Sequence, residues 1–266
     1  MTDFCFSLVM LGLVFLCVLL VSTPCFSLSQ YGVTEFESSV RLFSDEASGN
    51  STSSPISVTC QDLDGVGSLN TTCTLNSNLR FDSDVYVYGT GNLNILAHVL
   101  VDCPVEGCMI TFNVSGTIHL GQSARIVAGS VVFSAINLTM DSNSSIYTTA
   151  LAGPPPSQTS GTPYGIDGAG GGHGGRGASC VKSNKTTYWG GDVYAWSSLH
   201  DPWSYGSEGG VKLSTKNIRG KGGGRVKLIL TDTVHVNGTV SADGGDAGEE
   251  GGGGSGGSIC IRAVKL

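Results

Sequence analysis

Five apolar residues with one fixed spacing occur twice in this chain, far apart in the sequence. They fall at relative positions 0, 2, 4, 8 and 10, first as Ile110, Phe112, Val114, Ile118 and Leu120, and again as Val226, Leu228, Leu230, Val234 and Val236. A shift of 20 residues also relates neighbouring segments, and the matched pairs are Ile118 with Leu138, Leu120 with Met140, and Ile126 with Ile146. Because 20 residues is the size of one turn of a solenoid, the chain reads as one short unit used repeatedly.

Apolar and polar residues alternate within this unit, which is typical of β-strands with one buried face. The residues expected to face solvent include Asn113, His119, Asn137, Thr139, His235 and Asn237. An antiparallel sandwich also alternates with period 2, but it does not require a fixed offset between successive apolar groups. The sequence therefore favours an all-β fold, namely a right-handed parallel β-helix-like solenoid of the pectin-lyase-like kind, with long Gly-rich loops.

Glycine accounts for 40 of the 266 residues and occurs in clusters. Glycine costs about 1 kcal/mol relative to alanine inside a helix, so this composition weakens any helical interpretation. Collagen is excluded, because the glycines do not recur every third residue and prolines number only 8. Two segments of the form Gly-Gly-x-Gly-Gly, 171–175 and 253–257, are each followed by a cysteine. We expect them to be equivalent excursions from the same edge of the stack, with insertions near 152–179 and 241–258.

The N-terminus has the pattern of a secretory signal. An uncharged apolar run, 4–22, precedes small residues at positions −3 and −1 of a cut after Ser27. We expect residues 1–27 to form a signal helix that is removed, and the alternative is a retained membrane anchor, since the run is barely long enough to span a bilayer. Residues 28–58 read as a flexible, Ser-rich leader, and 59–266 as the β-helix-like extracellular segment. The expected location is the secretory pathway, outside the cell or at its surface.

The cysteine count supports secretion. Cleavage would remove three cysteines and leave six, Cys60, Cys73, Cys103, Cys108, Cys180 and Cys260, an even set suited to an oxidising compartment. We predict the pairs Cys60–Cys73 and Cys103–Cys108, with Cys180–Cys260 joining the ends of the two Gly-rich excursions. No pair has zinc-ligand spacing, so the sequence predicts no metal site and no cofactor.

Seven Asn-x-Ser/Thr triplets follow the signal, and none has proline in the middle. They are Asn50, Asn70, Asn113, Asn137, Asn143, Asn184 and Asn237. One triplet alone is weak evidence, but seven behind a signal sequence predict a glycosylated surface. The predicted glycosylation sites are consistent with the predicted strand orientation, because three of the seven lie at positions that the alternation turns outward.

No complete catalytic motif is present. The glycines 170, 172 and 175 satisfy the dinucleotide fingerprint but neither follow a clear strand nor open a helix, so the match is compositional. The run around His173 is similar to the Gly-His-Gly element of polygalacturonases, which are parallel β-helices. That family also supplies paired carboxylates for glycoside hydrolysis, and the Asp-Asp element is missing here. A pectin-active enzyme is therefore the alternative function, with no catalytic residue assigned.

Charged residues suggest only weak binding roles. The net charge of −7 argues against nucleic acid as a partner. Four acidic residues, Asp243, Asp246, Glu249 and Glu250, fit a solvated loop better than a calcium site. Six basic residues lie close together at Lys212, Lys216, Arg219, Lys221, Arg225 and Lys227. They could meet an anionic polymer, but alternation with apolar residues favours the solvent face of strands.

Four stretches of the mature chain are characteristic: residues 57–63, Tyr-Gly-Ile-Asp-Gly-Ala-Gly at 164–170, the Gly-Gly-His-Gly-Gly-Arg-Gly-Ala run, and the Ser-Gly-Gly-Ser-Ile close. With them, the mature chain resembles the N-terminal part of the large plant glycine-rich cell-surface proteins. It implies an extracellular segment of a membrane protein, with no catalytic residue to transfer. We therefore expect a noncatalytic extracellular glycoprotein that contacts or recognises the cell wall or cell surface, with cell-wall polysaccharide as a possible partner. A membrane would be reached only through an uncleaved signal or a missing C-terminal part.

The last nine residues, 258–266, still alternate between apolar and polar side chains. No polar closing turn or amphipathic helix follows Val240, and a solenoid needs a cap over its terminal coil. We therefore expect this chain to be the beginning of a longer solenoid.

Overall fold

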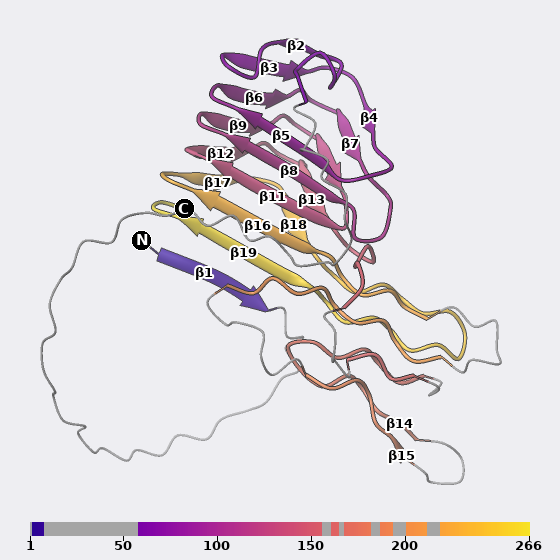
Figure 1. The fold of residues 1–266 in the computed structure, drawn as a ribbon. Helices are drawn as coiled ribbons and strands as arrows, with labels where there is room; N and C mark the ends of the chain where they lie inside the picture. Colours follow the sequence, from indigo (N-terminus) through magenta and orange to yellow (C-terminus); the bar gives the residue numbers. More distant parts are fainter. Residues whose placement is uncertain are drawn as a thin grey trace, which may run out of the picture. The chain divides into compact units, whose positions relative to one another are not determined.

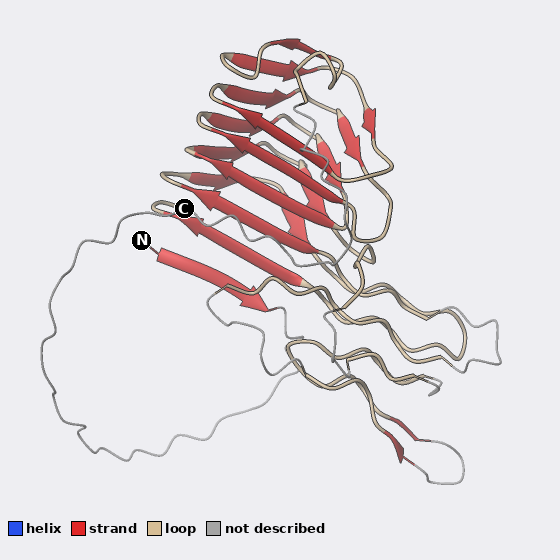
Figure 2. Cartoon of the chain, viewed as in Figure 1, coloured by secondary structure: helices blue, strands red, loops and turns tan. Residues whose placement is uncertain are grey.

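The computed structural model describes residues 2–7, 58–155, 161–164, 168–181, 187–193, 201–211 and 219–266. These residues are all-β, and most of their strands belong to three sheets with parallel pairing (Figures 1 and 2). Sheet A contains β5 (Val85–Gly89), β8 (Met109–Val114), β11 (Ser130–Ala135), β16 (Arg225–Leu230), β19 (Ser258–Ala263) and β1 (Thr2–Ser7). Sheet B contains β2 (Gly65–Gly67), β3 (Thr72–Leu75), β6 (Asn92–Ile95), β9 (Thr117–Leu120), β12 (Asn137–Met140) and β17 (Val234–Val236). Sheet C contains β4 (Leu79–Arg80), β7 (Leu100–Asp102), β10 (Arg125–Val127), β13 (Ser145–Tyr147) and β18 (Thr239–Ser241).

The chain visits the three sheets in a repeating order. From β3 onward it passes through sheet B, sheet C and sheet A in turn, and each new strand lies beside the strand of the previous circuit. The predicted 20-residue offset is confirmed, since Ile118 pairs with Leu138 and Ile126 with Ile146. The more distant repeat is also explained, because Val131 of β11 pairs with Ile110 on one side and Val226 on the other. This arrangement is consistent with a β-helix-like fold.

Apolar side chains from successive circuits form one continuous core. In each strand the alternate residues are buried, as in β9, where Ile118 and Leu120 are buried and their neighbours are half-exposed. Phe112 and Phe133 are fully buried and stack with their ring centroids 5.4 Å apart. Most of the core side chains come from the strands, so the alternation seen in the sequence is the direct cause of the layer structure.

Antiparallel strands lie at the two ends of the stack. At one end β2 pairs antiparallel with β3, and the Cys60–Cys73 disulfide joins the turn before β2 to β3 itself. At the other end β1 pairs antiparallel with β19. Of the segment predicted as a signal helix, Thr2–Ser7 therefore form a strand, and the remainder lies outside the described residues, together with most of the predicted leader.

Both Gly-rich segments leave from the same edge of the stack, as predicted. The first connects β13 to β16 and the second connects β18 to β19, so each departs from sheet C and returns to sheet A. The first includes a small antiparallel pair, β14 (Cys180–Val181) and β15 (Thr187–Tyr188). The first excursion is longer than predicted, because it runs from the end of β13 to the start of β16 rather than only near 152–179.

The Gly-rich segments bind one another through backbone hydrogen bonds that recur every third residue. Gly206 and Gly209 donate to the carbonyl oxygens of Gly223 and Gly220 at 2.8 and 2.9 Å. The segment 252–257 forms bonds with the same interval to three neighbours, 207–210, 220–223 and 242–245. These residues belong to neither helices nor strands. Three residues per turn is the period of a polyproline II helix, which has no internal hydrogen bonds and leaves its backbone free to bond outward. We call the segments 206–210, 220–223, 242–245 and 252–257, which these bonds join, the glycine lattice.

Close approach of backbones explains why the lattice needs glycine. A Cβ atom at Gly209 or Gly252 would lie closer than 3.0 Å to a carbonyl oxygen of the adjacent segment, that of Gly252 and Ala169 respectively. Real Cβ atoms do not make such contacts, so a side chain at either position would force the segments apart. Gly253 is different, because its nearest neighbour would be 3.9 Å away.

Candidate functional site

The outer face of sheet B carries two columns of small polar side chains. Strand alternation turns them away from the core, and parallel pairing places equivalent residues side by side. The first column is Thr74, Asn94, His119, Thr139 and His235. The second is formed by the pairs Thr72 with Asn92 and Thr117 with Asn137. We call these residues the polar columns.

Hydrogen bonds between strands hold the polar columns in place. The Nδ1 and Nε2 atoms of His119 lie 2.9 Å from Asn94 Oδ1 and 3.1 Å from Asp141 Oδ2. Asn92 accepts a bond from the Thr117 backbone N–H at 2.8 Å and donates from Nδ2 to Thr72 Oγ1 at 3.3 Å. The side chains are therefore ordered before any partner arrives, which lowers the entropic cost of binding.

The spacing of the polar columns is set by the sheet. Neighbouring strands lie about 4.8 Å apart and outward residues on one strand are about 6.6 Å apart, so hydroxyl, amide and imidazole groups recur on a regular grid. The polar columns contain no lysine, arginine or carboxylate. Such a surface can exchange hydrogen bonds with a neutral, hydroxyl-rich polymer, and it offers no fixed charge to a phosphate or a uronate.

The sequence identified only part of this surface. His119, Asn137, Thr139 and His235 were expected to face outward, and they do so as exposed or half-exposed residues. The members on β3 and β6 were missed, because these strands were not matched to the repeat. The short alternations Thr-Cys-Thr at 72–74 and Asn-Leu-Asn at 92–94 carry the signal that would have found them.

His173 is buried inside the glycine lattice and does not face solvent. It is 6% exposed, and its Nδ1 atom lies 2.8 Å from the carbonyl oxygen of Gly256. Ser255 donates to the carbonyl of Gly172 at 3.2 Å, so the two Gly-Gly-x-Gly-Gly runs lie side by side. Burial lowers the pKa of His173, and the bond to Gly256 opposes this only in part. His173 therefore joins the two excursions. Its imidazole is not accessible to a substrate, although the comparison with the polygalacturonase element would require it.

The basic residues form ion pairs and stacks with their own chain. Lys221 Nζ lies 2.7 Å from Glu208 and 3.2 Å from Glu106, and the hydrogen bond to Glu208 is the main cause of its raised pKa. Lys227 pairs with Asp201 at 2.8 Å, and Arg219 pairs with Glu208 at 2.7 Å. Lys212 and Lys216 lie outside the described residues. The four described members of the cluster are thus ion-paired or stacked on aromatic rings rather than presented to an anionic polymer.

Arg225 lies between two aromatic rings of the segment 201–205. Its guanidinium carbon is 4.2 Å from the ring centroids of both Trp203 and Tyr205. Tyr205 also exchanges a hydrogen bond with Ser130 at 2.7 Å. The segment 201–205 therefore covers part of the outer face of sheet A as a structural strap.

The acidic residues of the second excursion do not converge on a metal site. Asp243 accepts a hydrogen bond from Ser241, and Asp246, Glu249 and Glu250 are exposed. Within the described ranges, no group of three His, Cys, Asp or Glu side chains is arranged to hold a metal ion.

Two of the three predicted disulfides are present, Cys60–Cys73 and Cys103–Cys108. They indicate an oxidising compartment, as in the secretory pathway. The prediction of a Cys180–Cys260 bond is wrong. Cys180 is a free thiol on the β14–β15 hairpin, whereas Cys260 is disulfide-bonded, but not to Cys180. Cys260 lies in β19 of sheet A, where it is opposite Lys227 and Cys5 in the strand register. It therefore belongs to a different sheet from the hairpin.

Five of the seven predicted glycosylation sites lie in the described residues. Asn70, Asn143 and Asn237 are exposed, whereas Asn113 and Asn137 are half-exposed on strands. Asn137 accepts a bond from the Thr233 N–H through Oδ1, which leaves Nδ2 available for a sugar. Asn50 and Asn184 lie outside the described residues.

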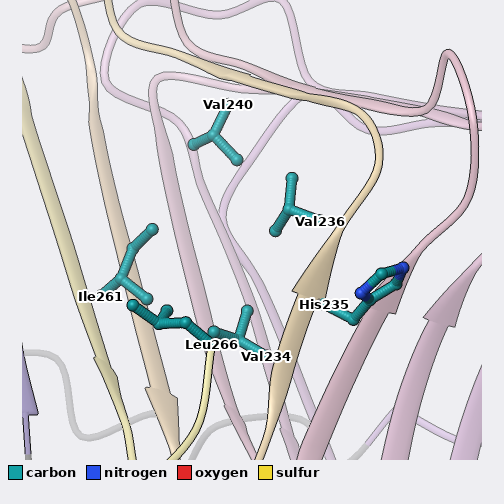
Figure 3. Close-up of a pocket in the computed structure, with 6 residues that line it drawn as sticks. All are labelled: Val234, His235, Val236, Val240, Ile261 and Leu266. Carbon is teal, nitrogen blue, oxygen red and sulfur yellow. The ribbon is translucent and has the colours of Figure 1, made fainter.

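A small apolar pocket of about 390 Å³ lies at the β17 end of the stack (Figure 3). It is lined by Val234, His235, Val236, Val240, Ile261 and Leu266. Among these six described residues His235 alone has a polar side chain, so the pocket offers no constellation for chemistry.

The chain matches no protein-family model, no curated protein and no solved structure. Nor does the described part of the chain contain a helix that could span a bilayer.

Proposed function

We propose that this chain is a noncatalytic extracellular glycoprotein segment that contacts neutral cell-wall polysaccharide through the polar columns of sheet B. The proposal includes a right-handed parallel β-helix, entry into the secretory pathway, and membership of the plant glycine-rich cell-surface proteins that the sequence resembles. The observation that carries it is the regular grid of hydroxyl, amide and imidazole groups, without lysine, arginine or carboxylate, on the outer face of sheet B.

Several features support a contact role over the pectin-active alternative. Glycoside hydrolysis needs two carboxyl groups that flank the scissile bond. His119 has Asp141 beside it at 3.1 Å, but that carboxylate is bonded to the imidazole. The histidine of the Gly-His-Gly run is buried and bonded to Gly256. An extended polymer can instead gain many weak hydrogen bonds along the stack, because β3, β6, β9 and β12 each add a pair of polar side chains and β17 adds His235.

A panel of immobilised neutral and acidic plant polysaccharides tests this function. We expect the secreted protein to bind neutral polymers, and the triple variant Thr74→Ala, Asn94→Ala, His119→Ala to bind at least about tenfold more weakly, since each lost hydrogen bond removes about 1 kcal/mol. None of these three residues belongs to a glycosylation triplet. The matched control is Val127→Ala with Tyr147→Ala, a pair on the outer face of sheet C, which should bind like wild type.

Equal weakening by both sets, or no binding by the wild-type protein, would contradict the proposal. Reducing-sugar release from pectin that disappears in His173→Asn would support the enzyme instead.

A further inference from the structure

Two tyrosines on β5 form an exposed aromatic pair. Tyr86 and Tyr88 are separated by one residue, so both point to the outer face of sheet A, where they are 39% and 57% exposed. Their exposure contrasts with Val87 between them, which is fully buried. The strap 201–205 packs against Arg225 and Lys227 of β16 on this sheet. The tyrosine pair is on β5, which is at the opposite edge of the sheet from β19 and β1.

A predicted glycosylation site faces this pair directly. In the parallel register between β5 and β8, Asn113 is the partner of Tyr88 and Thr111 the partner of Tyr86. Asn113 Nδ2 donates to the hydroxyl of Tyr86 at 3.2 Å. The nitrogen that would carry a sugar thus already lies level with the end of the Tyr86 ring. One of its two hydrogens remains after glycosylation, so the bond to Tyr86 can persist.

None of the other described sites has a tyrosine as its partner on a neighbouring strand. Asn137 has Thr117 as its strand partner, and Asn70, Asn143 and Asn237 lie in turns. On the other side of Asn113, its partner on β11 is Ser134. A sugar attached at Asn113 therefore has an aromatic surface on one side and a small hydroxyl on the other.

We propose that the N-glycan of Asn113 packs its first N-acetylglucosamine against Tyr88, and that this glycan stabilises the fold. The C–H face of the sugar ring is apolar and weakly positive, which complements the negative face of an aromatic ring. The contact also covers aromatic surface that is otherwise left in water. The inference depends on secretion but not on polysaccharide binding by sheet B.

A double-mutant cycle on protein secreted from a glycosylating host tests this contact. Ser115→Ala abolishes the glycosylation triplet but leaves Asn113 and its bond to Tyr86 intact, and the backbone bond from Ser115 N–H to Gly89 is kept. We expect Ser115→Ala to lower the Tm by about 2 to 4 °C in the wild-type background. In the Tyr88→Ala background the same change should leave the Tm unaltered, because the sugar then has no ring to contact.

Two controls separate a specific contact from a general effect of glycosylation. Thr239→Val removes the glycan of Asn237, and its effect on the Tm should not depend on the side chain at position 88. Tyr147→Ala removes an exposed tyrosine from sheet C and should leave the effect of Ser115→Ala unchanged. Intact-mass analysis measures occupancy of each site. An unoccupied Asn113, or an equal Tm loss in the wild-type and Tyr88→Ala backgrounds, would overturn the proposal, whereas loss of polysaccharide binding by the sheet B variant would leave it standing.

Discussion

The stack of sheets and the glycine lattice are both ordered, but different interactions hold them together. In the stack, apolar side chains such as Phe112 and Phe133 fill the interior, and the backbone bonds lie within sheets. In the lattice, segments approach so closely that a side chain at Gly209 or Gly252 has no room, and backbone bonds at three-residue intervals connect one segment to several neighbours. The comparison teaches that glycine content here marks a second ordered architecture rather than loose loops.

The largest effect is expected in the core of the stack. Phe133→Ala should lower the free energy of unfolding by about 3 to 5 kcal/mol, because it removes a fully buried ring and leaves a cavity beside Phe112. Urea denaturation measures the loss. Ile136→Ala, at an exposed position just after β11, is the control and should change stability by less than about 0.5 kcal/mol. Equal losses for the two variants would mean that the core is not where the stack gains its stability.

The next effect concerns the end of the stack that β2 covers. Replacing Cys60 and Cys73 together by alanine should cost about 3 kcal/mol, since the bond closes a loop with a sequence separation of 13. Cys180→Ala is the control, because that thiol is free, and its unfolding midpoint should match the wild type. Thiol labelling of the native wild-type chain that modified Cys60 or Cys73 would argue against the bond.

Within the lattice, two adjacent glycines should behave differently. Gly252→Ala should destabilise the lattice by about 1 to 3 kcal/mol, because its Cβ would overlap the carbonyl of Ala169. Gly253→Ala should be nearly neutral, since its Cβ has no neighbour nearer than 3.9 Å. Hydrogen exchange should show faster exchange around 206–210, 220–223 and 252–257 in the first variant, with β8 and β11 still protected. Similar exchange in both variants would remove the distinction drawn between the two regions.

The smallest effect is the pH dependence contributed by His173. Its pKa is lower in the folded protein than in the unfolded chain, because burial disfavours the imidazolium. Below the ordinary value of 6.5 the unfolded chain therefore binds more protons, and stability falls as the pH decreases. His173→Asn keeps a side-chain donor for the Gly256 carbonyl but does not titrate. Its urea midpoint should fall less between pH 7.5 and pH 5 than that of the wild type, and identical slopes would contradict the assignment.

The sequence predicted the stack better than the lattice for a physical reason. Inward residues of a strand must be apolar, so the spacing of Ile118 and Leu138 was enough to predict their register. The lattice is built from backbone groups, which leave no pattern of side-chain types beyond the glycines themselves. The Cys180–Cys260 prediction failed because the two runs lie side by side but continue into different elements, with Cys180 in the β14–β15 hairpin and Cys260 in β19. The packing of Trp203 and Tyr205 on Arg225 was also not predicted, because residues 201–205 show no periodicity that indicates what they contact.

The polar columns were partly predictable. Outward positions follow from the strand phase, and that rule found His119 and Thr139. It could not supply the bonds from His119 to Asn94 and Asp141, which depend on side chains from three different circuits or turns.

The scarcity of side chains in the glycine lattice has a consequence for its response to temperature. Exposure of apolar surface gives unfolding its large positive heat capacity, and this makes stability decline on cooling as well as on heating. The lattice residues that contact one another are mostly glycines joined by amide bonds, and polar exposure lowers the heat capacity instead. The stability curve of the lattice should therefore be flatter than that of the stack, so that on chilling the sheets weaken while the lattice keeps its order.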